Sequence, residues 1–77
     1  MEPWTEPKRD LWGGESLRDF KRRARGERAA WLRAAGRPWE EVAEEVGLAS
    51  KGAAYNSAKR FGRPEHVARW PEGRAEP

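Results

Sequence analysis

The chain has 77 residues, of which 38% are charged and 36% hydrophobic, and its formal net charge is +3 at pH 7. Such a short chain supports one small domain with a limited core, and the lack of cysteine excludes disulfides and thiolate metal sites. No apolar run reaches the roughly 18 residues of a membrane span, and no signal-peptide pattern opens the chain. We therefore expect a cytoplasmic protein without a membrane partner.

Residues 1–14 are expected to form an extended or flexible arm. The two prolines in this stretch disfavour a helix and push the residue before each of them toward extended geometry. Trp4 and Trp12 either fold back onto the helical body or contact a partner protein. Lys8 and Arg9 either follow a DNA groove or remain solvated. The simplest interpretation is a frayed arm that is anchored by Trp12.

A helical domain is expected over residues 15–70, and its first helix begins after Ser16. Asp19 follows this serine by three residues, which is a capping-box pattern. The predicted buried stripe of the helix consists of Leu17, Phe20 and Ala24. Gly26 costs roughly 1 kcal/mol in a helix interior, so a break is predicted there. A second helical stretch ends at Gly36, and its inward residues are Trp31, Leu32 and Ala35.

Basic side chains surround the first helix. The candidate contacts to a phosphate backbone are Lys21, Arg22, Arg23 and Arg25, with Arg37 as a fifth. Each cation that neutralises a phosphate of duplex DNA adds about 0.9 to the salt slope of binding. Because these residues lie on several sides of the helix, a solubilising surface is an equally good interpretation.

Residues 38–61 are predicted to form two short helices joined by a tight turn. Pro38 suits a first helical turn, where its missing N–H needs no partner. The first helix has an apolar face at i, i+3, i+4 and i+7, made of Trp39, Val42, Ala43 and Val46. Gly47 suits a left-handed C-terminal cap, and Ser50 suits the N-cap of the second helix. The inward residues of that second helix are Ala54, Ala58 and Phe61.

The run GRPWEEVAEEVGLAS resembles the G-x-[ST]-[WY]-x-[DE]-[IV]-A-x-x-[LV]-G pattern of helix-turn-helix DNA-binding domains. It is most similar to the trihelical, homeodomain-like kind found in phage and mobile-element proteins, including resolvase-type and terminase-small-subunit-type domains. The match covers about residues 27–61, a little under half of the chain. Ala43 allows the helices to cross closely, and Gly47 allows the chain to turn. Residues 48–50 make the turn one residue longer than its tightest form, so recognition positions can slip by one.

The pattern and the resemblance together predict an all-α bundle of three to five short helices that binds double-stranded DNA. In this interpretation residues 50–61 form the helix that enters the major groove. The predicted DNA contacts are Ser50, Lys51, Gly52, Tyr55, Asn56, Lys59, Arg60 and Arg63. Lys51 is placed for a phosphate or guanine contact, and Asn56 for a bidentate pair with adenine. Tyr55 either touches the DNA backbone or supports the core. A single helix with few base-reading side chains favours a homo-oligomer.

Charge alternates along the chain. Residues 8–37 hold ten basic and four acidic side chains, residues 38–50 carry −4, and residues 51–63 carry +4. This alternation suits a domain with one positive face for phosphates and a negative face for solvent or a partner. Ordinary solvated faces are the alternative interpretation.

Catalysis is not expected from this sequence. The lone His66 is interpreted as an incidental exposed residue, the glutamates of residues 40–45 diverge around a helix, and no Gly-rich phosphate loop is present. We therefore expect no cofactor and no metal. Residues 64–70 are predicted to form one helical turn that places Val67 and Trp70 against the bundle. Residues 71–77 are expected to form a flexible tail.

A protein-interaction module that acts on the transcription or DNA-processing machinery is the rival hypothesis. Its support is the acidic helix and the five tryptophans, because tryptophan is enriched at binding hot spots. A third possibility is nonspecific binding of single-stranded nucleic acid on stacked aromatic rings. The favoured function is DNA binding in a phage, mobile-element or transcription-regulation context, in the cytoplasm or on the nucleoid.

Overall fold

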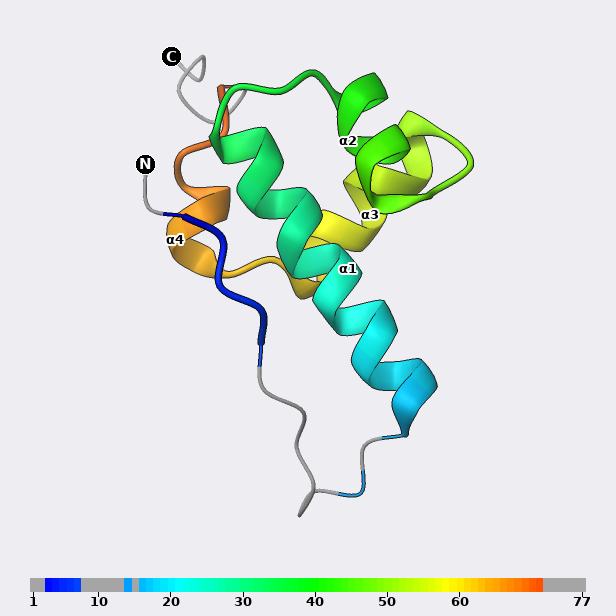
Figure 1. Ribbon diagram of the computed structural model, residues 1–77. Helices are drawn as coiled ribbons and strands as arrows, with labels where there is room; N and C mark the ends of the chain where they lie inside the picture. The colour runs from blue at the N-terminus through cyan, green and yellow to red at the C-terminus, as the bar shows by residue number, and fades with distance from the viewer. Residues whose placement is uncertain (1–2, 8–13, 15, 72–77) are drawn as a thin grey trace.

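The computed structural model describes residues 3–7, 14 and 16–71, and in this part of the chain it contains helices but no strand. The four helices there are α1 (Leu17–Ala34), α2 (Trp39–Val46), α3 (Lys51–Phe61) and α4 (Pro64–Val67). α1 runs through the middle of the molecule with α2 to one side and α4 to the other, and α3 crosses behind it (Figure 1). The predicted all-α bundle is therefore confirmed. Lys8, Arg9, Trp12 and the tail beyond residue 71 lie outside the described residues.

Local hydrogen bonds fix the helix ends where the sequence predicts them. The Ser16 hydroxyl accepts from the Asp19 N–H at 3.1 Å, and the Ser50 hydroxyl accepts from an N–H in the first turn of α3 at 3.2 Å. Both serines thus satisfy a donor that has no partner within its helix. Gly47 ends α2 in the left-handed conformation, with a φ of +73°. Pro38 differs slightly from its predicted position, because it is the N-cap residue of α2 rather than part of the first turn.

The predicted break at Gly26 is wrong, because α1 continues through this residue. Gly26 is buried where α1 crosses α3. A Cβ atom on it would lie 2.6 Å from the Ser57 carbonyl oxygen and 2.7 Å from Phe61 Cβ, which leaves no room for a side chain. The roughly 1 kcal/mol of helix propensity lost at glycine is offset by this close packing of the two helices.

The core consists mainly of small side chains around one tryptophan. Its buried hydrophobic residues are Ala29, Ala30, Leu32, Val42, Ala43, Ala54, Ala58 and Trp70. The Trp70 indole N–H donates to the Ala30 carbonyl oxygen at 3.0 Å, and its ring meets Trp39 edge-on with centroids 5.0 Å apart. This one indole therefore fills space between helices and also satisfies its polar atom. Its position next to α4 agrees with the helical turn predicted before it.

Several residues that the sequence places inward are not fully buried. Leu17 is 49% exposed, and Ala35 is exposed as the C-terminal cap of α1. Phe20 and Phe61 are half-buried. At the start of α1 the reason is visible in Figure 1, where the first turns of this helix extend beyond the other three. Apolar side chains on these turns have little to pack against.

Residues 3–7 lie beside α1 and α4 (Figure 1). The Trp4 ring centroid is 5.9 Å from that of Trp31 and 6.3 Å from that of His66. Trp4 therefore folds back onto the helical body. The prediction of an exposed His66 is wrong: the residue is 9% exposed, and its Nδ1 atom has no hydrogen-bond partner within the described part of the chain.

Replacing Gly26 by alanine should destabilise the protein, although alanine is the better helix former. The new methyl group would meet the backbone of α3, so we expect the free energy of unfolding in urea to fall by about 1–3 kcal/mol. Gly52→Ala is the matched control, because a Cβ there approaches only Ser50 Oγ, at 3.8 Å. The control should be neutral or stabilise by up to about 1 kcal/mol. Equal effects of the two changes would contradict the role assigned to Gly26.

The protein should also become less stable as the pH is lowered and His66 becomes protonated. Burial is the largest cause that lowers the pKa of His66 below its usual 6.5; Arg63 and Arg69 lower it further, and Glu65 and Glu27 oppose them. Below about pH 6.5 the unfolded chain therefore binds more protons than the folded one. The free energy of unfolding thus decreases as the pH is lowered. Wild type should lose more stability than His66→Gln between about pH 7.5 and about pH 5. Parallel pH profiles would disprove this.

Candidate nucleic-acid interface

α3 turns one polar face to solvent. Ala54 and Ala58 are buried on its inner side. The opposite side consists of four exposed residues, which we call the outer face of α3: Gly52, Asn56, Lys59 and Arg60. Their spacing of i, i+4, i+7 and i+8 keeps them on one side of the helix. Half of the predicted DNA contacts therefore lie together on one accessible surface.

Two other predicted contacts serve the fold. Ser50 caps α3 through its hydroxyl. Tyr55 is half-buried, with its ring centroid 5.4 Å from that of Trp39 and 6.0 Å from that of Trp70. Lys59 Nζ lies 5.8 Å from the Tyr55 ring centroid, within the range of a cation–π contact. Of the two interpretations of Tyr55, the structure supports the one in which it is a support residue.

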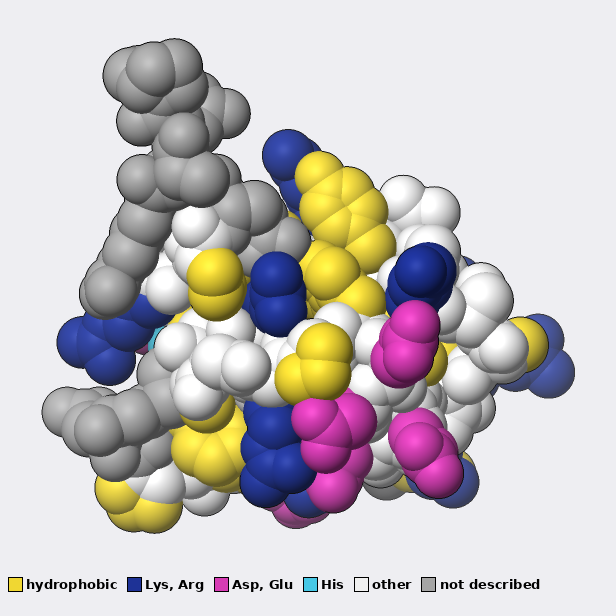
Figure 2. Space-filling view, turned by 90° about the horizontal axis from the view of Figure 1, so that it is seen from above, with side chains coloured by type: hydrophobic (Ala, Val, Ile, Leu, Met, Phe, Trp, Pro, Cys, Tyr) yellow, Lys and Arg dark blue, Asp and Glu magenta, His cyan; other side chains and the backbone are white. Residues whose placement is uncertain are grey.

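The carboxylates of α2 hold three basic side chains in exposed ion pairs. These pairs are Lys51–Glu40 at 3.8 Å, Arg37–Glu41 at 3.4 Å and Arg28–Glu45 at 3.7 Å. Figure 2 shows acidic side chains gathered on the face seen from above, with Lys or Arg side chains directly beside them. Because all six side chains are at least 42% exposed, each pair adds little stability and is easily exchanged.

Glu27 is a buried carboxylate that holds two guanidinium groups. It is 7% exposed, and it accepts from Arg63 Nε at 2.8 Å and from Arg23 Nη1 at 3.1 Å. Arg63 also donates to the Thr5 carbonyl oxygen at 3.4 Å, and its guanidinium carbon lies 5.4 Å from the Trp4 ring centroid. The sequence places both arginines among the phosphate contacts. Their guanidinium groups instead join α1, the end of α3 and the N-terminal segment.

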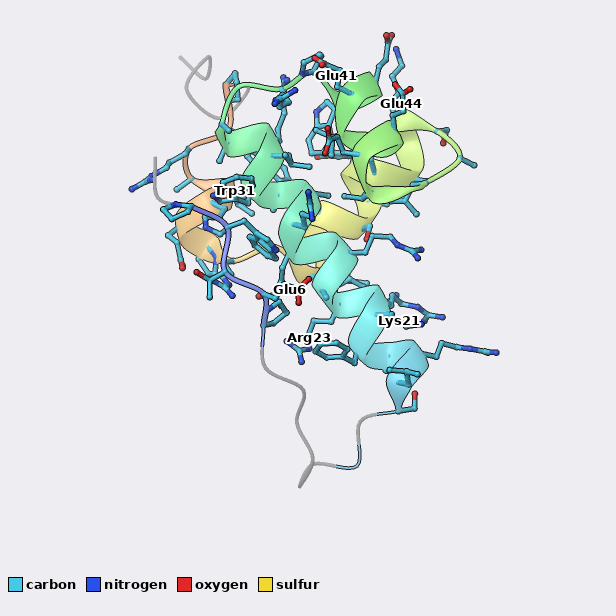
Figure 3. The ribbon with its side chains drawn as sticks, viewed as in Figure 1. Glu6, Lys21, Arg23, Trp31, Glu41 and Glu44 are labelled. Carbon is cyan, nitrogen blue, oxygen red and sulfur yellow. The ribbon has the colours of Figure 1, made fainter. Side chains whose placement is uncertain are left out.

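Four basic side chains of α1 form a separate exposed row. We call them the α1 stripe, and they are Arg18, Lys21, Arg22 and Arg25. Among the residues that the structure describes, no carboxylate lies within ion-pair distance of any of them. Figure 3 shows that Lys21 and Arg23 project on opposite sides of α1. The basic residues that the sequence places all around this helix thus divide into a stripe facing solvent and Arg23, which faces Glu27.

A groove between α1 and α3 joins the stripe to the outer face of α3. We call it the α1–α3 groove, and its lining residues are Arg22, Arg25, Leu48, Asn56, Ser57, Arg60 and Phe61. The Arg60 guanidinium carbon lies 5.3 Å from the Phe61 ring centroid, so the apolar part of the lining supports the charged part. Arginines from two helices, a serine hydroxyl and an asparagine amide therefore meet in one place. All of these groups can donate hydrogen bonds to an anion.

The glutamates of α2 and the α1 stripe lie toward opposite ends of the molecule, although cations pair with the α2 glutamates and Asp19 lies in the first turn of α1. In Figure 3, Glu41 and Glu44 project from the α2 end, and Lys21 projects near the opposite end, from the first turns of α1. An anionic polymer would be drawn to the α1 stripe and away from α2.

Three residues with clear roles are absent from the contacts predicted from the sequence. Arg18 precedes Arg22 and Arg25 by four and seven positions, a helical spacing that the sequence itself contains. Glu27 follows Arg23 by four positions, which indicates only their local pair, and Ser57 carries no such signal. Glu27 acquires its role from Arg63, which is 36 residues away, and Ser57 acquires its role from the crossing with α1.

Comparisons of the chain with protein-family models, with curated proteins and with solved structures found no match. Within the described ranges, no helix has the length and apolar character needed to cross a membrane.

The different environments of two glutamates generate a prediction. Glu27→Gln removes the charge from a buried carboxylate with two arginine partners, and we expect the free energy of unfolding to fall by about 2 kcal/mol. Glu45→Gln is the control, because its pair with Arg28 is exposed and should be worth less than about 1 kcal/mol. Urea denaturation measures both. If the two variants were equally stable, Glu27 would not be the structural link described here.

Proposed function

We propose that the protein binds double-stranded DNA through the α1 stripe and the outer face of α3. The observation that carries the proposal is the concentration of basic side chains without carboxylate partners, within the described part of the chain, on these two adjacent helices. Phosphate charges dominate the affinity of proteins for DNA. A positive surface formed by two adjacent helices suits a polyanion of this kind.

The arrangement of α2 and α3 supports a helix-turn-helix mode of binding, which the resemblance in the sequence also implies. In this mode α2 crosses the phosphate backbone and α3 enters the major groove. Gly52 allows close approach to base edges because it has no side chain and open space around it. Lys51 remains available for a phosphate, since its side chain is 68% exposed and its only ion pair in the described residues is weak.

The proposed interface omits three of the basic residues that the sequence predicts and includes one that it does not. Arg23 and Arg63 are left out because Glu27 holds both guanidinium groups. Arg37 is left out because it precedes α2 and belongs neither to the α1 stripe nor to the outer face of α3. Arg18 is added, because it continues the α1 stripe.

We further propose that binding to a specific site requires a homo-oligomer. The outer face of α3 offers one asparagine amide and two cations, which is few for reading a sequence alone. Two-fold symmetric copies would read half-sites one helical turn apart. A role in transcription regulation, or in a phage or mobile element acting on the nucleoid, follows from the resemblance and belongs to the same proposal.

Salt-dependent binding tests the proposal. Wild-type protein should bind random duplex DNA at low salt, with an affinity that falls steeply as salt increases. Lys21→Ala and Lys59→Ala should each lower the slope of log affinity against log salt by about 0.9, because each removes one phosphate contact. Fluorescence anisotropy on a labelled duplex measures the slope.

Arg28→Ala is the control for charge alone. It removes one positive charge like the two lysine variants, but Arg28 pairs with Glu45 and lies outside both helix surfaces, so the slope should hardly change. The rival protein-interaction function predicts a different result. In that case the lysine variants would be silent in partner binding, and Glu41→Lys with Glu44→Lys would abolish it. Absence of duplex binding by wild type at low salt would overturn the DNA-binding proposal.

A further inference from the structure

The α1–α3 groove gathers three guanidinium groups from two different helices. Arg22 and Arg25 come from α1, and Arg60 comes from α3. Like charges in one groove repel one another, and among the described residues no carboxylate pairs with any of the three. Elsewhere in the described chain, Glu27 alone compensates two guanidinium groups. The groove therefore has the charge balance of a site whose anion comes from outside the chain.

The groove lies beside the close crossing of α1 and α3 at Gly26. Gly26 follows Arg25 directly in the sequence, and a Cβ on it would lie 2.6 Å from the Ser57 carbonyl oxygen and 2.7 Å from Phe61 Cβ. Ser57 and Phe61 also line the groove. The same contact that locks α1 onto α3 thus fixes the distance between the two sets of arginines.

The neutral donors of the groove have the chemistry of a phosphate site. Asn56 offers an amide NH2 and Ser57 a hydroxyl, and neither side chain has a hydrogen-bond partner in the described residues. Guanidinium groups bind the paired oxygens of a phosphate through two parallel N–H···O bonds. Phe61 and Leu48 supply apolar surface beside these donors, against which the aliphatic parts of the arginine side chains can pack.

We propose that the α1–α3 groove seats one phosphodiester group of the nucleic-acid backbone, bound jointly by Arg22, Arg25 and Arg60, with Asn56 and Ser57 donating to its oxygens. This inference rests on the proposed DNA binding and assigns one of its contacts. It also changes the role of Asn56, which contacts the backbone here and reads no base. The seated phosphate would fix the register of α3 on the duplex.

A double-mutant cycle across the two helices tests the shared phosphate. Arg25→Ala and Arg60→Ala should each weaken binding to a random duplex by about tenfold, which corresponds to the loss of one charged hydrogen bond. If both arginines hold one phosphate, the second substitution removes little that the first has not already removed. The double variant should then bind more tightly than expected from multiplying the two single losses of affinity. Circular dichroism checks that the variants keep the wild-type helix content, and Arg25→Lys retains the charge if Arg25→Ala unfolds.

Arg18→Ala combined with Arg60→Ala provides the matched control. Arg18 belongs to the α1 stripe but lies outside the groove. The fold-losses of DNA affinity caused by Arg18→Ala and Arg60→Ala should therefore multiply in the double variant. Asn56→Ala should weaken binding to two unrelated duplex sequences by the same factor. The phosphate seat would be overturned if wild type binds duplex DNA but the losses of affinity caused by Arg25→Ala and Arg60→Ala multiply independently. It would also be overturned if Asn56→Ala weakens binding to only one of the two sequences. In both cases the proposed DNA binding would remain. Failure of wild type to bind any duplex would overturn both.

Discussion

The close crossing of α1 and α3 is the contact on which the other features of the structure depend. It requires a residue without a side chain at Gly26, because the backbone of Ser57 and the side chain of Phe61 occupy the space that a Cβ would need. The buried alanines of α1 and α3 continue this close approach along the interface. A core of small side chains buries little apolar area per residue. Trp70 compensates for this by filling the remaining space with one large ring.

Ion pairs determine which basic residues of this protein remain uncompensated, as much as the positions of these residues do. Glu27 takes two arginines into the fold, and the glutamates of α2 pair with three cations at the surface. Within the described chain this leaves the α1 stripe and Arg60 without a carboxylate at ion-pair distance. The positive face therefore depends on the placement of the carboxylates, because Glu27, Glu40, Glu41 and Glu45 pair with basic residues outside it. A net charge of +3 gives no indication of how concentrated the remaining charge is.

The geometry of the crossing and the distribution of charge support each other functionally. The first turns of α1 extend beyond the other helices (Figure 1), which costs apolar burial at Leu17 but exposes the stripe. The crossing then places this stripe beside α3, so that two helices and not one form the proposed DNA surface. Under this proposal α1 is both the main packing partner of α3 and an extension of its binding face. The N-terminal segment is held near Glu27, on the side of α1 that Arg23 faces.

The sequence by itself determined where α1 and α3 begin and where α2 ends. Ser16, Ser50 and Gly47 act through hydrogen bonds and backbone angles within a few residues, so their neighbours in the sequence are enough to predict them. Helical periodicity likewise identified the inward faces of α2 and α3. Only the tertiary structure decided what happens between segments that are far apart: Gly26 continues a helix, and Arg63 belongs to Glu27. His66 is buried under Trp4, and Arg25 lies beside Arg60 in a common groove. Local propensity and spacing carry no information about such partners, because the free energy of each contact depends on a residue that packing alone brings close.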